Sequence, residues 1–163
     1  MLELIIKAAL SYLLGSLVGS LLIGNVHLYA GCSPAHARAR AMQTRHLLRQ
    51  LDTLPRLPTV IAGDFNMTIE YERTNDGPTG FDLMKEAGFT EIAAGETGQI
   101  ATMSRENNRF ARYTPLRKPE RRLTQVFYRG EGIRLAGSPT ICLNDPPVSD
   151  HFGLSTTLEL APD

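Results

Sequence analysis

Two polar residues in the middle of the chain have the types and the spacing needed to act on a phosphate ester. Residues Thr59–Ala62 form an apolar, β-branched run that predicts a short buried strand, and Gly63, Asp64, Phe65 and Asn66 follow it. Side chains alternate along a strand, so we expect Asp64 and Asn66 to point to one side and Phe65 to the core. A carboxylate can orient or deprotonate a water while a carboxamide holds a phosphoryl oxygen. The alternative is a plain turn, because Asp and Asn bond readily to their own backbone.

Further residues that could do chemistry lie near the two ends of the chain. Asp150 and His151 are adjacent in the sequence VSDHFG at 148–153, and a bend is needed to bring both side chains to one pocket. Asn25 and His27 share the polar face of an alternating segment, Asn25–Ala30, which predicts a strand. A lone histidine on a strand is often structural, so a structural role is the alternative for His27.

Together, the segments NVHL at 25–28, GDFN at 63–66 and SDHFG at 149–153 resemble three signatures of the endonuclease/exonuclease/phosphatase family, in that family's order. The family comprises metal-dependent phosphodiesterases, among them abasic-site endonucleases, deoxyribonuclease I-like enzymes, inositol phosphatases and bacterial sphingomyelinases. The resemblance covers about residues 23–160 and implies an α/β fold, the DNase I-like α/β sandwich, truncated to roughly its second half. It places a partial domain at residues 25–163, after a hydrophobic segment at residues 1–24.

The resemblance also implies site residues, a cofactor and a class of substrate. The catalytic residues would be Asp64, Asn66, His27 and His151, the substrate-binding residues Asn25 and Arg122, and the metal ligand Asp150. The metal would be Mg²⁺ or Mn²⁺. The substrate would be a phosphate ester of a nucleic acid, a phospholipid or a sugar, and the motifs do not distinguish these three.

Two departures from the family pattern predict a weakened site. The hydrophobic segment stands where the family has an Asn and a Glu metal ligand, and Glu3 is the only acid before Asp52. A Mg²⁺ ion held by one carboxylate fewer keeps more water and binds weakly. The segment Arg122–Tyr128 resembles the family's Arg-Leu-Asp strand, but Thr124 replaces the Asp that normally pairs with the imidazole.

We therefore expect a Mg²⁺-dependent phosphodiester or phosphomonoester hydrolase that is weak or inactive as this chain alone. The alternative is a non-catalytic remnant that acts as an interaction domain or a membrane-tethered domain. The absent Glu and the replacement at Thr124 favour this alternative.

Composition limits the kinds of partner that the chain can have. Its 163 residues include 17 basic and 17 acidic side chains, so no overall field favours a polyanion and any phosphate affinity must be local. The length suits one domain with a real core. Cys32 and Cys142 lack metal-type spacing and predict neither a zinc site nor a disulfide framework. We expect both to be buried as small apolar residues.

The N-terminal segment has two interpretations. Residues 8–24 carry no charge, which makes them slightly shorter than the roughly 20 residues of a bilayer span, and Gly15 and Gly19 have the spacing of a close helix contact in lipid. The chain would then be membrane-associated through residues 8–24, or a small integral membrane protein with a soluble tail. We favour a cytoplasmic protein in which Leu4–Leu14 forms a buried helix that leads into a core strand at Leu21–Ala30.

The remaining pattern predicts the elements around the site. Ala35–Leu54 is rich in good helix formers and predicts a helix, as does Phe81–Ala87. The arginines of the longer helix are expected on a solvated face: Arg38, Arg40, Arg45 and Arg49. The polar run that follows Asn66, including Glu72, predicts a surface loop at the rim of the site.

Two predictions concern the C-terminal third of the chain. The segment Arg105–Arg122 is strongly basic and either binds phosphate through its arginines or forms a solvated loop. The segment Phe152–Leu160 alternates between apolar and polar residues and predicts one closing strand.

Overall fold

A computed structural model describes residues 21–73, 76–92, 101–104, 106–111, 120–142 and 149–161. The helix expected between residues 4 and 14, whether buried or membrane-spanning, lies outside these residues, as does much of the basic segment 105–122. Within the described ranges, no helix is both long enough and apolar enough to cross a membrane.

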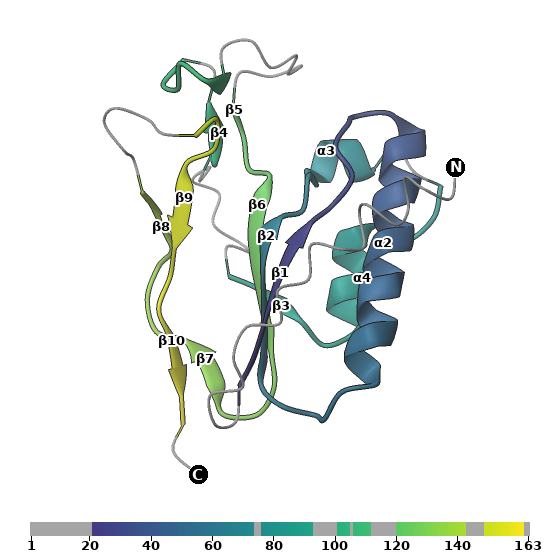
Figure 1. Cartoon of the computed structure of the whole chain (residues 1–163), viewed down its shortest axis with the longest axis vertical. Coiled ribbons are helices and arrows are strands. Elements are labelled where there is room, and N and C mark those ends of the chain that lie inside the picture. The colour runs from purple at the N-terminus through teal and green to yellow at the C-terminus, as the bar shows by residue number, and fades with distance from the viewer. Residues whose placement is uncertain are drawn as a thin grey trace.

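A four-stranded mixed sheet forms the centre of the structure (Figure 1). In spatial order its strands are β1 (Leu22–His27), β2 (Thr59–Asp64), β6 (Thr124–Arg129) and β3 (Thr90–Glu91). β1 and β2 are parallel, whereas β6 is antiparallel to both β2 and β3. The strands predicted near residues 25, 60 and 125 are present, and β2 is longer than expected because it continues as far as Asp64.

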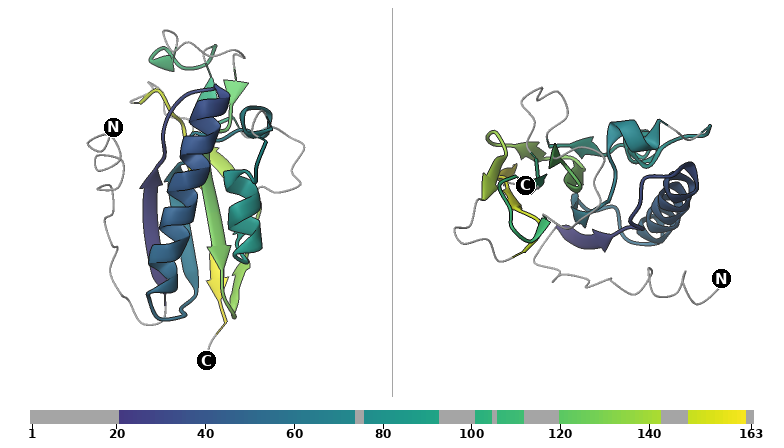
Figure 2. Two further views of the ribbon diagram at one scale, coloured as in Figure 1. Left: turned by 90° about the vertical axis from the view of Figure 1, so that its right-hand side faces the viewer. Right: turned by 90° about the horizontal axis from the view of Figure 1, so that it is seen from above.

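Helices cover one face of this sheet (Figures 1 and 2). The helix α2 (Pro34–Asp52) connects the parallel strands β1 and β2, which need such a crossover. The helices α3 (Ile69–Glu72) and α4 (Gly80–Glu86) follow β2 along the chain. The core between helices and sheet is apolar and includes Val26, Leu47, Leu51, Ile61, Phe65, Met84 and Phe127.

Local sequence explains where the two longer helices begin. Ser33 accepts a hydrogen bond from the backbone N of His36 at 3.3 Å and returns one from its own backbone N to the His36 ring, which caps α2. Thr79 and Asp82 form the same reciprocal cap at the start of α4. Both helices therefore start where the sequence predicts, within one residue.

Short antiparallel strand pairs form a second layer on the other face of the sheet (Figure 2). These pairs are β7 (Ile133–Leu135) with β10 (Leu158–Leu160), β8 (Thr140–Cys142) with β9 (Gly153–Ser155), and β4 (Met103–Ser104) with β5 (Glu120–Arg121). Val126 of the sheet packs in one cluster with Leu135 and Leu154 of this layer. The single closing strand predicted at 152–160 is wrong, because the structure divides it between β9 and β10, which pair with different partners.

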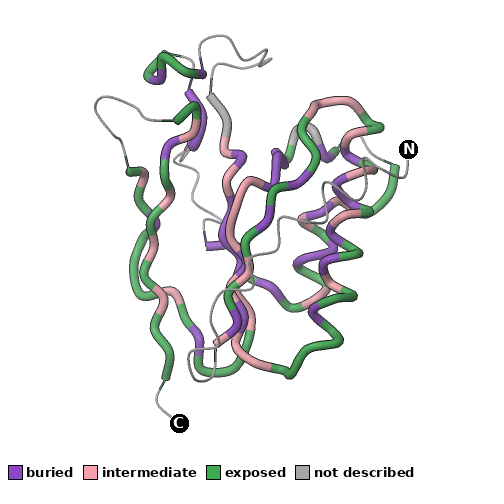
Figure 3. The backbone as a smooth tube through the Cα atoms, in the orientation of Figure 1, coloured by how far each residue is buried: buried purple, intermediate pink, exposed green. Residues whose placement is uncertain are grey.

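The expected burial of two charged residues is also wrong. Burial follows the inner faces of the helices and the central sheet (Figure 3), and it includes Arg40 and Glu72, which are 0% and 1% exposed. Arg40 Nε donates to Glu72 Oε1 at 2.7 Å, and Arg40 Nη1 donates to the carbonyl oxygens of Tyr29 and Gly31. A buried charge needs such partners, so this pair joins α2 to α3 and to the loop after β1.

The two cysteines also differ from expectation. Both are free cysteines. However, Cys32 is only half-buried and Cys142 is exposed, so neither is a core residue. Cys142 is exposed because it ends β8, one of the short strands of the second layer.

Candidate active site

Three polar residues lie in one row across the central sheet. In the strand register, His27 of β1 pairs with Asp64 of β2, and Asp64 pairs with Thr124 of β6. Directly opposed residues point to the same face of a sheet. Two residues earlier along β2, Ala62 pairs with Val126 in the apolar cluster between the sheet and the second layer. The site is therefore the polar end of an otherwise apolar interface.

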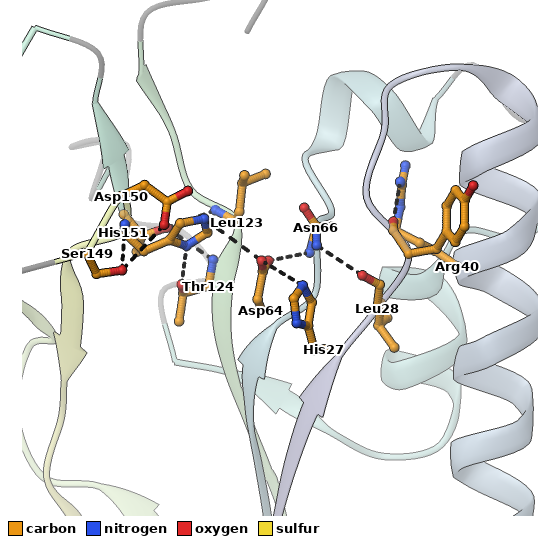
Figure 4. Close-up of polar contacts among 12 residues, drawn as sticks. His27, Leu28, Arg40, Asp64, Asn66, Leu123, Thr124, Ser149, Asp150 and His151 are labelled. Carbon is orange, nitrogen blue, oxygen red and sulfur yellow. Dashed lines mark hydrogen bonds and ion pairs between the residues drawn. The ribbon is translucent and has the colours of Figure 1, made fainter. Parts of the chain in front are cut away.

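The Asp64 carboxylate lies between two imidazole rings (Figure 4). Its Oδ2 is 3.5 Å from Nε2 of His27 and 3.9 Å from Nε2 of His151. The side chains of Asp64 and His151 are 22% and 20% exposed, whereas that of His27 is 65% exposed. A ligand that enters from solvent would therefore meet His27 first, with Asp64 and His151 behind it.

A tight turn joins Asp64 to Asn66. The strand ends at Asp64, Phe65 is fully buried as expected, and Asn66 has a positive φ of 51°. The backbone N of Asn66 donates to Asp64 Oδ1 at 2.9 Å, and its Nδ2 donates to the carbonyl oxygen of Leu28 at 3.0 Å. Strand alternation does not explain the pair, because Asn66 lies beyond β2. The turn expected as the alternative is therefore present. It holds Oδ1 of Asp64 and leaves Oδ2 facing the two imidazoles.

The segment around His151 bends, as a shared pocket requires. The backbone N of His151 donates to Ser149 Oγ at 3.2 Å, and the ring turns back toward the sheet (Figure 4). There Nδ1 of His151 lies 3.3 Å from Oγ1 of Thr124, while Nε2 faces Asp64. Asp150 is exposed, and its Oδ1 accepts a hydrogen bond from Ser149 Oγ at 3.4 Å. The structure thus brings His151 to Asp64 and leaves Asp150 at the solvent side of the same bend.

Asn25 lies two residues before His27, so both side chains are on one face of β1. Its Oδ1 is close to Gly63: a Cβ at position 63 would be 2.7 Å from this oxygen and 2.0 Å from the carbonyl oxygen of Val26. Gly63 also has a φ of +143°, which other residues rarely adopt. This glycine lets β1 and β2 approach closely just before the His27–Asp64 pair.

Arg122, the other expected substrate-binding residue, contacts an acid. Its Nη2 lies 2.5 Å from Oε1 of Glu91 in β3. Burial raises the pKa of the Glu91 carboxyl above its ordinary range, and the guanidinium of Arg122 partly offsets this effect. The arginine thus balances a partly buried carboxylate of the sheet.

The described residues do not fit a complete Mg²⁺ site. In this part of the chain, no group of three or more His, Cys, Asp or Glu side chains is placed to hold a metal ion. Mg²⁺ demands near-octahedral oxygen ligands, whereas the two oxygens of Asp64 face a backbone N–H and two imidazole nitrogens. A Mg²⁺ or Mn²⁺ ion with Asp150 as its ligand therefore stays a prediction.

Two buried polar residues support the site and were not predicted. Thr102 accepts hydrogen bonds from the backbone N atoms of Leu123 and Thr124, and Asn108 Nδ2 donates to the carbonyl oxygen of Ser149 at 2.7 Å. Neither residue is charged or belongs to a recognisable motif. Thr102 is 0% exposed and Asn108 is 1% exposed, although both lie in a polar stretch of the sequence. Their burial results from tertiary packing, which the sequence alone does not reveal.

Solved structures share this architecture. An endonuclease/exonuclease/phosphatase protein from Beutenbergia cavernae DSM 12333 has a TM-score of 0.64 and 19% identity, over 92% of this chain and 38% of that one. TDP2 from D. rerio, complexed with a single-strand DNA product, has a TM-score of 0.61 and 16% identity, over 88% and 58%. Beta toxin from Staphylococcus aureus has a TM-score of 0.58 and 17% identity, over 87% and 54%. The chain has the fold of the endonuclease/exonuclease/phosphatase family.

This likeness is one of structure. No protein-family model and no curated protein sequence matches the chain. The chain spans between 38% and 58% of the length of the three proteins, so it corresponds to about half of the endonuclease/exonuclease/phosphatase fold. The α/β class and the partial extent predicted from the NVHL, GDFN and SDHFG segments are confirmed.

Proposed function

We propose that this chain carries the phosphoryl-binding half of a phosphodiester or phosphomonoester hydrolase, with low turnover as this chain alone. One observation carries the proposal: His27 and His151, which come from distant parts of the chain, flank the same oxygen of Asp64. A carboxylate between two imidazole donors suits a water next to a phosphoryl group. Because the structurally similar TDP2 was solved with a single-strand DNA product, nucleic acid is the best supported of the three substrate classes.

In the proposed reaction, a water attacks phosphorus in line with the leaving ester oxygen. Asp64 accepts a proton from the water as the new P–O bond forms. Negative charge develops on the phosphoryl oxygens. These oxygens accept hydrogen bonds from the imidazoles of His27 and His151 and from the side-chain amide of Asn66. The ester P–O bond then breaks, and the leaving oxygen takes a proton from the His151 imidazolium.

The low turnover follows from the partner of His151. A hydroxyl group, that of Thr124, faces its Nδ1 where the resembled family has a carboxylate. A hydroxyl can orient the ring but cannot stabilise the imidazolium to a comparable degree. In the serine protease triad, loss of the equivalent carboxylate lowers kcat by about 10⁴.

A second proposal is that the chain is a non-catalytic remnant that serves as an interaction or membrane-tethered domain. Thr124 beside His151 favours it, as does the lack of a group of three metal-binding side chains among the described residues. The two proposals differ in whether Asp64 supports any turnover.

Hydrolysis of three probes separates these proposals: abasic DNA, bis-p-nitrophenyl phosphate and sphingomyelin, each with Mg²⁺ or Mn²⁺. We expect slow hydrolysis of at least one probe by the unmodified chain, lost in Asp64→Ala and kept in Asp52→Ala, which removes an exposed carboxylate at the end of α2. No hydrolysis of any probe would favour the remnant. Equal hydrolysis by the unmodified chain and Asp64→Ala would contradict the proposed site.

A further inference from the structure

Thr102 is a fully buried residue that contacts two of the segments that form the site. Its side-chain Oγ1 accepts hydrogen bonds from the backbone N of Leu123 at 2.9 Å and from that of Thr124 at 3.1 Å. Its carbonyl oxygen accepts a third, from the backbone N of Phe152 at 2.7 Å. One residue thus holds the start of β6 and the residue that follows His151.

These bonds lie on both sides of the contact between Thr124 and His151. The hydroxyl of Thr124 lies 3.3 Å from the His151 ring, and both backbone segments on either side of this contact are bonded to Thr102. The carbonyl oxygen of Leu123 also accepts a hydrogen bond from the backbone N of Phe65 at 3.0 Å. The connection therefore extends to the turn that holds the Asp64 carboxylate.

We propose that Thr102 is a positioning residue, whose hydroxyl sets the distance between Thr124, His151 and Asp64. Its catalytic consequence rests on the proposed hydrolase function, but its structural consequence does not. Two backbone N–H groups depend on one buried oxygen, so removal of this oxygen leaves both donors without it, one in a buried bond and the other in a partly buried bond. Asn108 holds the other end of the His151 segment through Ser149, so Thr102 supplies one side of a two-sided support.

The test compares Thr102→Val, which keeps the shape and removes the oxygen, with Thr102→Ser, which restores the oxygen. Thr44→Val is the matched control, because Thr44 is also a fully buried threonine but its Oγ1 has no hydrogen-bond partner among the described residues. In ¹⁵N-labelled protein we expect Thr102→Val to change the tautomer populations of the His151 imidazole and to speed amide hydrogen exchange at Leu123 and Thr124 about tenfold. Thr102→Ser should restore both properties, and Thr44→Val should change neither.

In a chain that hydrolyses bis-p-nitrophenyl phosphate, Thr102→Val should also lower kcat by about 10- to 100-fold with little change in KM. Unchanged His151 tautomers and unchanged exchange in Thr102→Val would overturn the inference, whatever the activity of the chain. If Thr102→Val does not fold, hydrogen exchange in the unmodified chain decides: rapid exchange at Leu123 and Thr124, as in exposed amides, overturns the inference. Absence of hydrolysis by the unmodified chain bears on the proposed function alone, because neither the tautomer nor the exchange measurement needs turnover.

Discussion

The hydroxyl oxygen of Thr124 lies 3.3 Å from Nδ1 of His151, at the position where the resembled family places a carboxylate. Thr124 is also the register partner of Asp64 across β2 and β6, so the replacement is located at the centre of the site. The hydroxyl keeps the orienting contact and lacks the negative charge that would stabilise a protonated ring. This one contact is the structural basis of the low turnover that we propose.

Replacing Thr124 by Asp should raise the rate of bis-p-nitrophenyl phosphate hydrolysis by about tenfold or more, because a carboxylate beside Nδ1 stabilises the imidazolium. Thr124→Asn is the matched control, since asparagine has the shape of aspartate without its charge, and it should give no gain in rate. Steady-state kinetics at pH 7 measure both variants. An equal gain in Thr124→Asn would show that size rather than charge limits the site.

The buried ion pair between Arg40 and Glu72 should be essential for stability. Arg40→Met leaves an unpaired buried carboxylate and should lower the free energy of unfolding by about 3 to 5 kcal/mol. The double variant with Glu72→Met should lose less than Arg40→Met alone, because no unpaired charge remains. Urea denaturation measures these values, with Arg49→Met, an exposed arginine of the same helix, as the control. A single variant as stable as the unmodified chain would contradict the buried pair.

The cap of α4 should make a pH-dependent contribution to stability. Hydrogen bonds from the backbone N and the hydroxyl of Thr79 lower the pKa of Asp82 below its ordinary value of 3.8. A lowered pKa in the folded state means that the contribution is present above the unfolded value and is lost as the pH falls through the folded value. Asp82→Ala should therefore be less stable by about 0.5 to 1 kcal/mol at pH 7, and this difference should shrink below pH 3.8. Urea denaturation of both proteins at pH 7 and below pH 3.8 measures this difference in the free energy of unfolding. A difference that grows in acid would contradict the prediction.

Much of the architecture could be predicted from short-range patterns. Helix formers predicted α2, an apolar run predicted β2 and an alternating segment predicted β1, whereas β6 was expected from the family resemblance of residues 122–128. The meeting of Asp64 with His27 and His151 joins distant segments, and it was expected from the resemblance of three motifs to one family rather than from any local pattern. The helices and strands, by contrast, depend on neighbours in the sequence, so the sequence reveals them.

The features that the sequence did not predict depend on contacts between distant segments. Arg40 has the composition of a solvated helix face, but its partner Glu72 lies on the short helix α3, 32 residues further along the chain. Thr102 and Asn108 are uncharged residues in a polar stretch, and only the packed structure brings them to Thr124 and Ser149. The division of the last strand at residues 156–157 likewise depends on which partner strands are near.

The central claim is that His27 and His151 share Asp64 and bind one phosphoryl group. The most direct measurement is a titration of the ¹⁵N-labelled chain with dimethyl phosphate, an inert phosphodiester, followed through the imidazole resonances. We expect that the His27 and His151 signals move together with one common Kd, that the exposed His46 of α2 does not respond, and that Asp64→Ala alters the response. If the signals of His27 and His151 do not move, or move with different affinities, the two rings do not bind one phosphoryl group and the proposed site is wrong.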